Sequence, residues 1–309
     1  MKDYLDPQKS LVLFGLNEKI NFFINLYNSK KFPHVLMFSG EKGTGKFTLI
    51  NHFLTYLFDK DNYNIEKYTI NNQTSFYNLH SNNLFPNIIY LSGNNHKDTS
   101  INNIRNLKTK IFQSTLSSKD RFIIFDDVEL FNKNVLNALL KIIEEPSSKS
   151  YYLLINNKTR PIIETIHSRS LEIKHLVDKK SRINIIELLI KNLNLKTSID
   201  YELLNLTPGK FLVFNSLCQD NNIDVNADYI NNINLLLNLY KKNKNINFIN
   251  LILFLTDFYF VKREKEKLEN IEKIIESKSF IINNLNNFIM YNMNQNSLIN
   301  AINSKIYDG

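Results

Sequence analysis

Residues 121–170 have the sequence RFIIFDDVELFNKNVLNALLKIIEEPSSKSYYLLINNKTRPIIETIHSRS, and this stretch determines the fold that we expect. It opens with the apolar residues 122–125, which lead directly into the carboxylates Asp126 and Asp127. A continuous apolar run is typical of a strand buried in a parallel sheet. Because ligands bind at the carboxyl ends of parallel strands, we expect both carboxylates at a functional edge of the sheet.

The rest of the stretch alternates helix with strand. Residues 132–145 have helical apolar spacing and stop before Pro146, and residues 151–155 form a second apolar run. That run leads into Asn156 and Asn157. Strands that alternate with helices predict a parallel α/β sheet.

A glycine-bearing loop lies upstream, between a predicted strand at residues 34–38 and a predicted helix at residues 47–58. Its sequence GEKGTGK matches the phosphate-binding pattern GxxxxGK in the strand–loop–helix context that the pattern requires. Backbone N–H groups and a lysine in such a loop suit phosphate oxygens. The candidate phosphate-binding residues are Gly40, Gly43, Gly45 and Lys46.

The residue after the lysine departs from this pattern. A Ser or Thr hydroxyl normally follows the lysine and binds magnesium, but here Phe47 stands there and Thr48 comes one residue late. One residue turns a side chain by about 100° around a helix, so Thr48 should not face the metal. The loop is either a weak nucleotide site or a relic that holds none, and a simple glycine turn is the third alternative.

Together these motifs resemble the delta-prime subunits of the bacterial DNA polymerase III clamp loader, a family of AAA+ proteins. Residues 137–146, NALLKIIEEP, are also similar to the family word NALLKxLEEP. The resemblance is strong over residues 11–176, weaker to residue 218, and beyond that rests on helical content alone. It implies an α/β AAA+ module over residues 1–174, a small helical lid over 175–218 and an all-α collar for oligomerisation over 219–309.

The resemblance also assigns roles at the predicted sheet edge. Asp126 matches the aspartate that holds the magnesium shell, and Asp127 stands where active relatives have a glutamate that polarises water. The shorter side chain should depress turnover, because proton handling depends on the position of the carboxylate. Asn157 matches the sensor-1 polar residue, with Asn156 as the adjacent alternative.

A sensor-2 arginine is missing, since Gly209 and Lys210 occupy the corresponding positions. Together with Phe47 and Asp127, this departure predicts a module that hydrolyses little or no ATP. ATP or ADP with Mg²⁺ is then at most a weakly bound ligand of the residues named above.

Arg169 is the residue that the resemblance places in catalysis. The family signature Ser-Arg-Cys, here Ser168-Arg169-Ser170, presents its arginine to the nucleotide of a neighbouring subunit. A guanidinium suits this role because its planar fork donates several charge-assisted hydrogen bonds to phosphate and stays charged at cellular pH. The alternative is an ordinary surface arginine at the start of a strand.

We expect no metal held by protein side chains alone. Many relatives carry a four-cysteine zinc module between the phosphate loop and the acidic pair, but residues 59–120 contain no cysteine. His80 and His96 cannot build a tetrahedral site by themselves. The prediction is therefore no zinc, and the fold of residues 59–83 stays open.

Apolar spacing predicts the remaining elements. A helix is expected at residues 15–28, a strand at 85–91 and a helix at 101–112. From residue 178 onward only helices are expected, at residues 178–193, 207–217, 228–242, 246–264, 266–277 and 280–306.

Composition sets broad limits. A chain of 309 residues is expected to form two or three domains, and a net charge of +8 favours work near polyanions. The basic residues are scattered without a dense stripe, so direct DNA binding by the chain alone stays open. Cys218 is the single cysteine, which excludes an intrachain disulfide, and the sequence predicts a soluble cytoplasmic protein.

The resemblance implies a structural and regulatory role. Such a subunit assembles with gamma or tau and with delta, and the complex loads the sliding clamp at primer–template DNA, away from membranes. One alternative is an autonomous AAA+ ATPase, such as a gamma-type subunit or a helicase loader, against which Phe47, Asp127 and Gly209 argue. A free-standing DNA-binding protein is the other alternative and rests only on the positive charge.

Overall fold

The computed structural model describes residues 2–95, 119–146, 149–265 and 271–307. The chain divides into two compact units. Unit 1 comprises Met1–Leu193 and Thr207–Gly209, and unit 2 comprises Asn194–Leu206 and Lys210–Gly309. The predicted three-part division at residues 174 and 218 stays a prediction. The predicted helix at residues 101–112 and His96 lie outside the described residues.

Unit 1 is built on a five-stranded sheet in which every described pair of strands is parallel. In sheet order the strands are β4 (Ile88–Ser92), β5 (Arg121–Asp126), β6 (Ser150–Asn156), β1 (Val35–Ser39) and β7 (Leu171–Lys174). Helices cover both faces, as expected for parallel strands that are apolar on both sides.

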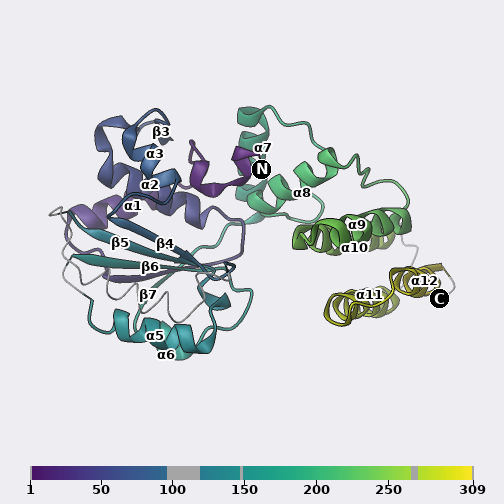
Figure 1. Ribbon diagram of the computed structural model, residues 1–309. Coiled ribbons are helices and arrows are strands. Elements are labelled where there is room, and N and C mark those ends of the chain that lie inside the picture. The colour runs from purple at the N-terminus through teal and green to yellow at the C-terminus, as the bar shows by residue number, and fades with distance from the viewer. Residues whose placement is uncertain (1, 96–118, 147–148, 266–270, 308–309) are drawn as a thin grey trace. The chain divides into compact units, whose positions relative to one another are not determined.

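Successive side chains of each strand point to opposite faces of the sheet. The helices α1 (Asn17–Asn28), α2 (Lys46–Phe58) and α3 (Ser75–Ser81) lie over one face, and α5 (Lys133–Ile143) and α6 (Glu164–His167) lie over the other (Figure 1). On β1, Leu36 and Phe38 pack with the first group, whereas Val35 and Met37 pack with the second. This alternation follows the two-residue period of a strand.

The register places polar residues from four strands at one edge of the sheet. Asn156 is the register partner of Ser39, the last residue of β1, and Asp126 ends β5 opposite Ser92. Because the strands are parallel, these residues share the carboxyl edge of the sheet. The predicted architecture, a parallel α/β sheet flanked by helices and followed by an all-α region, is confirmed.

Residues 59–83, which the sequence left open, are ordered by short elements. The 3-10 turn η3 (Lys60–Asn62) leads into an antiparallel pair, β2 (Tyr63–Asn64) and β3 (Thr69–Ile70), and α3 follows. The side chain of Thr74 caps α3 by accepting a hydrogen bond from the N–H of Tyr77.

The N-terminal chain begins with the turns η1 (Asp3–Leu5) and η2 (Pro7–Lys9), and buried hydrogen bonds tie η2 to this region. Gln8 Nε2 donates to the carbonyl of His80 at 2.6 Å, and Asn51 Nδ2 donates to the carbonyl of Gln8 at 2.9 Å. His80 Nε2 and Asn51 Oδ1 are 2.6 Å apart. His80 is therefore a partner of an amide in a buried network.

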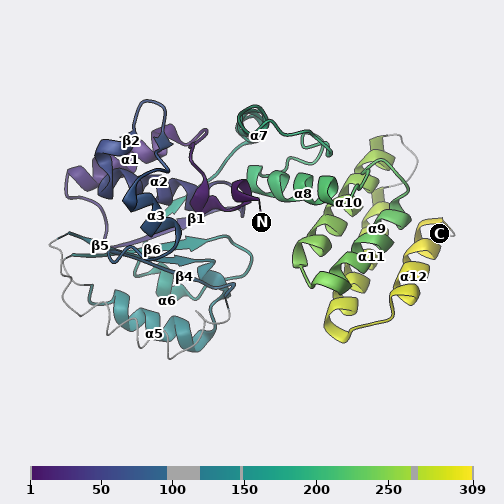
Figure 2. The same cartoon turned by 45° about the horizontal axis from the view of Figure 1, so that its top comes forward.

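Unit 2 is helical. Its helices are α8 (Pro208–Asp220, whose first two residues belong to unit 1), α9 (Tyr229–Asn243), α10 (Ile246–Lys265), α11 (Ile271–Tyr291) and α12 (Gln295–Tyr307). The last four pack side by side around buried apolar side chains (Figure 2). The helix α7 (Lys179–Leu193) belongs to unit 1.

The predicted single helix at residues 280–306 is wrong. The helix is interrupted between α11 and α12 at Asn292, which has a φ of 50°. Asn294 then accepts hydrogen bonds from the N–H groups of Asn296 and Ser297. Asparagine adopts this left-handed conformation more readily than most residues. Within the described residues, no helix is both long and apolar enough to cross a membrane.

Candidate nucleotide-binding site

The glycine loop joins β1 to α2 as predicted. Gly43 and Gly45 both have a φ of 86°, a conformation that glycine adopts without a steric cost. Lys46 begins α2, and its ammonium donates to the carbonyls of Gly40 at 2.8 Å and Glu41 at 2.7 Å. Burial lowers the pKa of Lys46 to about 8. The two hydrogen bonds show that the lysine is bonded to carbonyls of its own loop in this structure.

A buried histidine, His175, is hydrogen-bonded to the backbone of the glycine loop. His175 Nε2 lies 2.8 Å from the carbonyl of Thr44, and Lys19 Nζ lies 2.7 Å from His175 Nδ1. Because a carbonyl only accepts, Nε2 carries the proton and Nδ1 accepts from the lysine. Burial lowers the pKa of His175 to about 4, so the ring is neutral at physiological pH.

Phe47, in the position where the loop pattern has a magnesium ligand, packs against another aromatic ring. The ring of Phe47 is 8% exposed and meets Tyr90 edge-on, with 5.2 Å between ring centroids. Thr48 lies one step further along α2 and is half-buried. An aromatic ring therefore stands where a metal-binding hydroxyl would be needed.

Asp126 ends β5 and is held by two donors. The hydroxyl of Tyr90 donates to Oδ2 at 3.0 Å, and the N–H of Asp127 donates to Oδ1 at 2.9 Å. Burial, and then the neighbouring charge of Asp127, raise the pKa of Asp126 to about 6.

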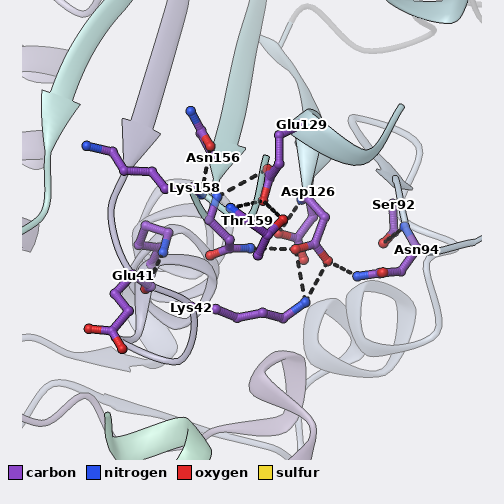
Figure 3. Close-up of polar contacts among 12 residues, drawn as sticks. Glu41, Lys42, Ser92, Asn94, Asp126, Glu129, Asn156, Lys158 and Thr159 are labelled. Carbon is purple, nitrogen blue, oxygen red and sulfur yellow. Dashed lines mark hydrogen bonds and ion pairs between the residues drawn. The ribbon is translucent and has the colours of Figure 1, made fainter. Parts of the chain in front are cut away.

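Asp127 is the centre of the polar network. It is 3% exposed and has a φ of 48°, so its side chain leaves the strand direction. Lys42 Nζ lies 3.0 and 3.1 Å from its two oxygens, and Asn157 Nδ2 donates to Oδ1 at 2.7 Å. Asn94 Nδ2 donates to Oδ2 (Figure 3). Three side chains from three loops therefore engage this one carboxylate.

Glu129 is a site residue that the sequence reasoning missed. It is 5% exposed and accepts hydrogen bonds from the N–H of Asn157 at 3.2 Å and from the Thr159 hydroxyl at 2.8 Å (Figure 3). These bonds fix the chain after β6 and aim the amide of Asn157 at Asp127. Asn156 instead accepts from the N–H of Lys158, so Asn157 is the asparagine that faces the acidic pair.

Residues 207–209 belong to unit 1 and contact the glycine loop. The hydroxyl of Thr207 donates to the carbonyl of Lys42 at 2.9 Å, and the N–H of Gly209 donates to the carbonyl of Gly43 at 2.8 Å. A Cβ at Gly209 would lie 2.8 Å from the Cα of Gly43. Glycine is thus required by close backbone contact at Gly209, one of the two positions, with Lys210, at which the resemblance leads us to expect an arginine in active relatives.

The residues fit a bound magnesium nucleotide poorly. Glycines suited to phosphate are present, but the lysine is bonded to loop carbonyls and Phe47 supplies no metal ligand. Asp127 already has a lysine and two amide partners. Among the described residues, no group of three or more His, Cys, Asp and Glu side chains could hold a metal.

Arg169 is not part of this cluster. It precedes β7, whose first residue Leu171 is the register partner of Leu36 near the start of β1. Arg169 thus lies at the amino edge of the sheet, whereas the loop after Ser39 lies at the carboxyl edge. A strand rises about 3.3 Å per residue, which puts the two edges roughly 15 Å apart.

Comparison with known proteins decides the family. The sequence profile described as DNA polymerase III, delta subunit matches residues 15–177, more than half of the chain. The chain belongs to this family. The resemblance drawn from the motifs is therefore confirmed.

Similar curated proteins carry related names. DNA polymerase III subunit delta' of Buchnera aphidicola subsp. Baizongia pistaciae is 28% identical over 163 residues, which cover 52% of this chain and 47% of that protein. Its counterpart in subsp. Schizaphis graminum is 30% identical over 161 residues, covering 47% and 44%. DNA polymerase III subunit tau of Bacillus subtilis is 25% identical over 166 residues, covering 53% and 28%. The match spans about half the length of the delta' relatives.

A solved structure is also similar. A DNA polymerase III gamma subunit-related protein from Thermotoga maritima aligns with a TM-score of 0.44 and 14% identity, covering 92% of this chain and 99% of that chain.

We expect this delta-family chain to lose stability in mild acid. Burial lowers the pKa of His52, His80 and His175 from 6.5 to about 4, so between these pH values the unfolded chain binds protons that the folded chain does not. Stability should therefore fall as the pH falls from 6.5 to 4, by at least about 2 kcal/mol. Asp126 acts oppositely between pH 6 and 3.8, but it is one group against three.

Urea unfolding at pH 7 and at pH 5 measures this difference. Asp126→Asn removes the opposing carboxyl, so this variant should show a steeper loss on acidification than the wild type. Equal unfolding free energies at the two pH values would contradict the prediction.

Proposed function

We propose that this chain is a clamp-loader delta-prime subunit of DNA polymerase III that hydrolyses little or no ATP and supplies Arg169 to the nucleotide of a neighbouring subunit. It would assemble with gamma or tau and with delta in the cytoplasm, and reach the sliding clamp and primer–template DNA through that complex. Membership of the DNA polymerase III delta-subunit family supports the setting.

The engagement of Asp127 is the observation that carries the non-hydrolysing part. A carboxylate that polarises water needs a free oxygen within hydrogen-bond reach of that water. Here Lys42 lies within 3.1 Å of both oxygens, and Asn157 and Asn94 donate to one each. The chain's own donors thus take the positions that attacking water would need. Phe47 adds to this because it brings no metal-binding hydroxyl.

The position of Arg169 supports a role in trans. A guanidinium at the amino edge of the sheet, roughly 15 Å from the loop on its own chain, cannot act on a phosphate held there. It is 37% exposed and therefore open to a neighbouring subunit. An arginine aimed at a transferring phosphoryl group stabilises its developing charge without any proton transfer.

Reconstitution tests the proposal. The purified chain is mixed with gamma or tau and delta subunits, and complex formation and DNA-stimulated ATP turnover are measured. We expect a stable complex whose ATP turnover requires the partner subunits, with negligible turnover by this chain alone. ATP turnover by the isolated chain would favour an autonomous ATPase, and tight, salt-dependent DNA binding without partners would favour a free-standing DNA-binding protein.

A further inference from the structure

The turn that carries Arg169 is rigid at its backbone. The N–H of Arg169 donates to the carbonyl of Ile166, and the hydroxyl of Ser170 donates to the same carbonyl at 2.8 Å. Ile166 is fully buried in the core between the sheet and α5. The Cα of Arg169 therefore has a fixed place, and the remaining freedom lies in its side chain.

That side chain is held by Glu144, the residue that caps the C-terminus of α5. Arg169 NH2 lies 2.8 Å from Glu144 Oε1, and NH1 donates to the carbonyl of Thr165 at 3.2 Å and more distantly to the Ser168 hydroxyl. A guanidinium has five N–H groups, so these contacts leave donors for another acceptor. The head group is thus oriented and still able to bind.

Glu144 is in an unfavourable place for α5 itself. It is the C-cap of α5, where the helix dipole favours cations over carboxylates. Its backbone is fixed by an N–H bond to the carbonyl of Leu140, beside the buried residues Ile142 and Ile143. A residue that breaks a local rule at a rigid position is a candidate for a role outside its own helix.

We propose that Glu144 is a positioning residue for Arg169, holding the guanidinium in the orientation in which it meets the phosphate on the neighbouring subunit. This inference rests on the proposed role of Arg169 in trans. Fixing a flexible arginine before it binds reduces the entropy lost when the phosphate arrives. Glu144 should therefore change the rate of the assembled complex much more than the stability of the chain, because exposed ion pairs contribute little to folding.

The test compares variants within the reconstituted complex of this chain with gamma or tau and delta. Glu144→Ala should lower DNA-stimulated kcat by about two- to fivefold, the effect of losing an exposed charge pair, with little change in the KM for ATP. Glu145→Ala is the matched control, because it removes an adjacent exposed carboxylate that is not among the described contacts of Arg169. It should keep the wild-type rate.

A double variant separates positioning from any independent effect of Glu144. Adding Glu144→Ala to Arg169→Ala should cause no further loss, because Glu144 then has no side chain to orient. Glu144→Asp should recover part of the rate. Thermal unfolding and complex assembly by each variant show whether folding or assembly is disturbed.

The outcomes distinguish the two proposals. If Arg169→Ala keeps the wild-type rate, the role of Arg169 in trans is wrong. If Arg169→Ala is slow but Glu144→Ala is as fast as Glu145→Ala, only the positioning role is wrong. A faster Glu144→Ala complex, or additive losses in the double variant, would also overturn the positioning role.

Discussion

Arg169→Ala is expected to slow clamp loading by the assembled complex by at least about tenfold while the chain stays folded. A trans arginine stabilises charge on the transferring phosphoryl group, and such residues contribute roughly 10³–10⁵ in rate in GTPases. The loss should be smaller here, because the other subunit interfaces are expected to keep their own arginines. Stability should change by less than about 0.5 kcal/mol, since the side chain is partly exposed and its ion pair with Glu144 is exposed as well.

Two matched variants sharpen this prediction. Arg169→Lys keeps the charge but loses the planar fork, so it should remain slow. Lys46→Ala in the same chain removes the ammonium of the phosphate loop and should leave the rate of the complex nearly unchanged. Clamp loading is followed with a labelled clamp on primed DNA, and ATP turnover is measured in parallel. Wild-type loading by Arg169→Ala together with failure of Lys46→Ala would mean that the chain uses its own nucleotide.

The strands and the phosphate loop could be predicted because their signals are local. The apolar run before Asp126 is a buried strand, and GEKGTGK lies between a strand and a helix. Parallel pairing then brings the ends of β1, β5 and β6 together, whatever side chains follow. Asn157 could be placed beside Asp127 on this ground, although the choice between Asn156 and Asn157 needed the hydrogen bond that the N–H of Asn157 donates to Glu129, which fixes the turn.

The contacts of Asp127 could not be predicted from sequence. Lys42 is one of the variable residues of the loop pattern, and Asn94 follows β4, so neither belongs to a motif. Their approach depends on the left-handed backbone of Asp127, which redirects the carboxylate away from the strand. The one available signal for Glu129 was its place three residues after Asp126, in the short 3-10 turn Val128–Leu130.

Long-range packing explains the other gaps. The hydrogen bond between Asn51 and His80 joins α2 to α3, and Asn51 also donates to the carbonyl of Gln8. In the sequence, each of these residues looks like an ordinary polar surface residue. The break at Asn292 was hidden by a helical apolar pattern that continues through it. In a chain this rich in asparagine, one asparagine with special backbone geometry has no distinguishing mark.

The isolated chain should hydrolyse ATP at least about a hundredfold more slowly than an ordinary ATPase, which turns over on the order of once per second or more. Three features of the site lead to this expectation. Phe47 faces Tyr90 where a magnesium-binding hydroxyl is needed, and Asp127 is engaged by Lys42. The N–H of Gly209 is bonded to the carbonyl of Gly43, and Gly209 and Lys210 are the positions where the resemblance leads us to expect an arginine.

Steady-state phosphate release by the purified chain, with and without primed DNA, measures this rate. Lys46→Ala is the control, because real turnover by this site must disappear when the loop lysine is removed, whereas a contaminating ATPase would persist. Relief of the contact with Asp127 by Lys42→Ala should not restore turnover, since Phe47 still provides no metal ligand and the sensor-2 arginine is still absent. Turnover near once per second that Lys46→Ala abolishes would show that this subunit is an ATPase in its own right.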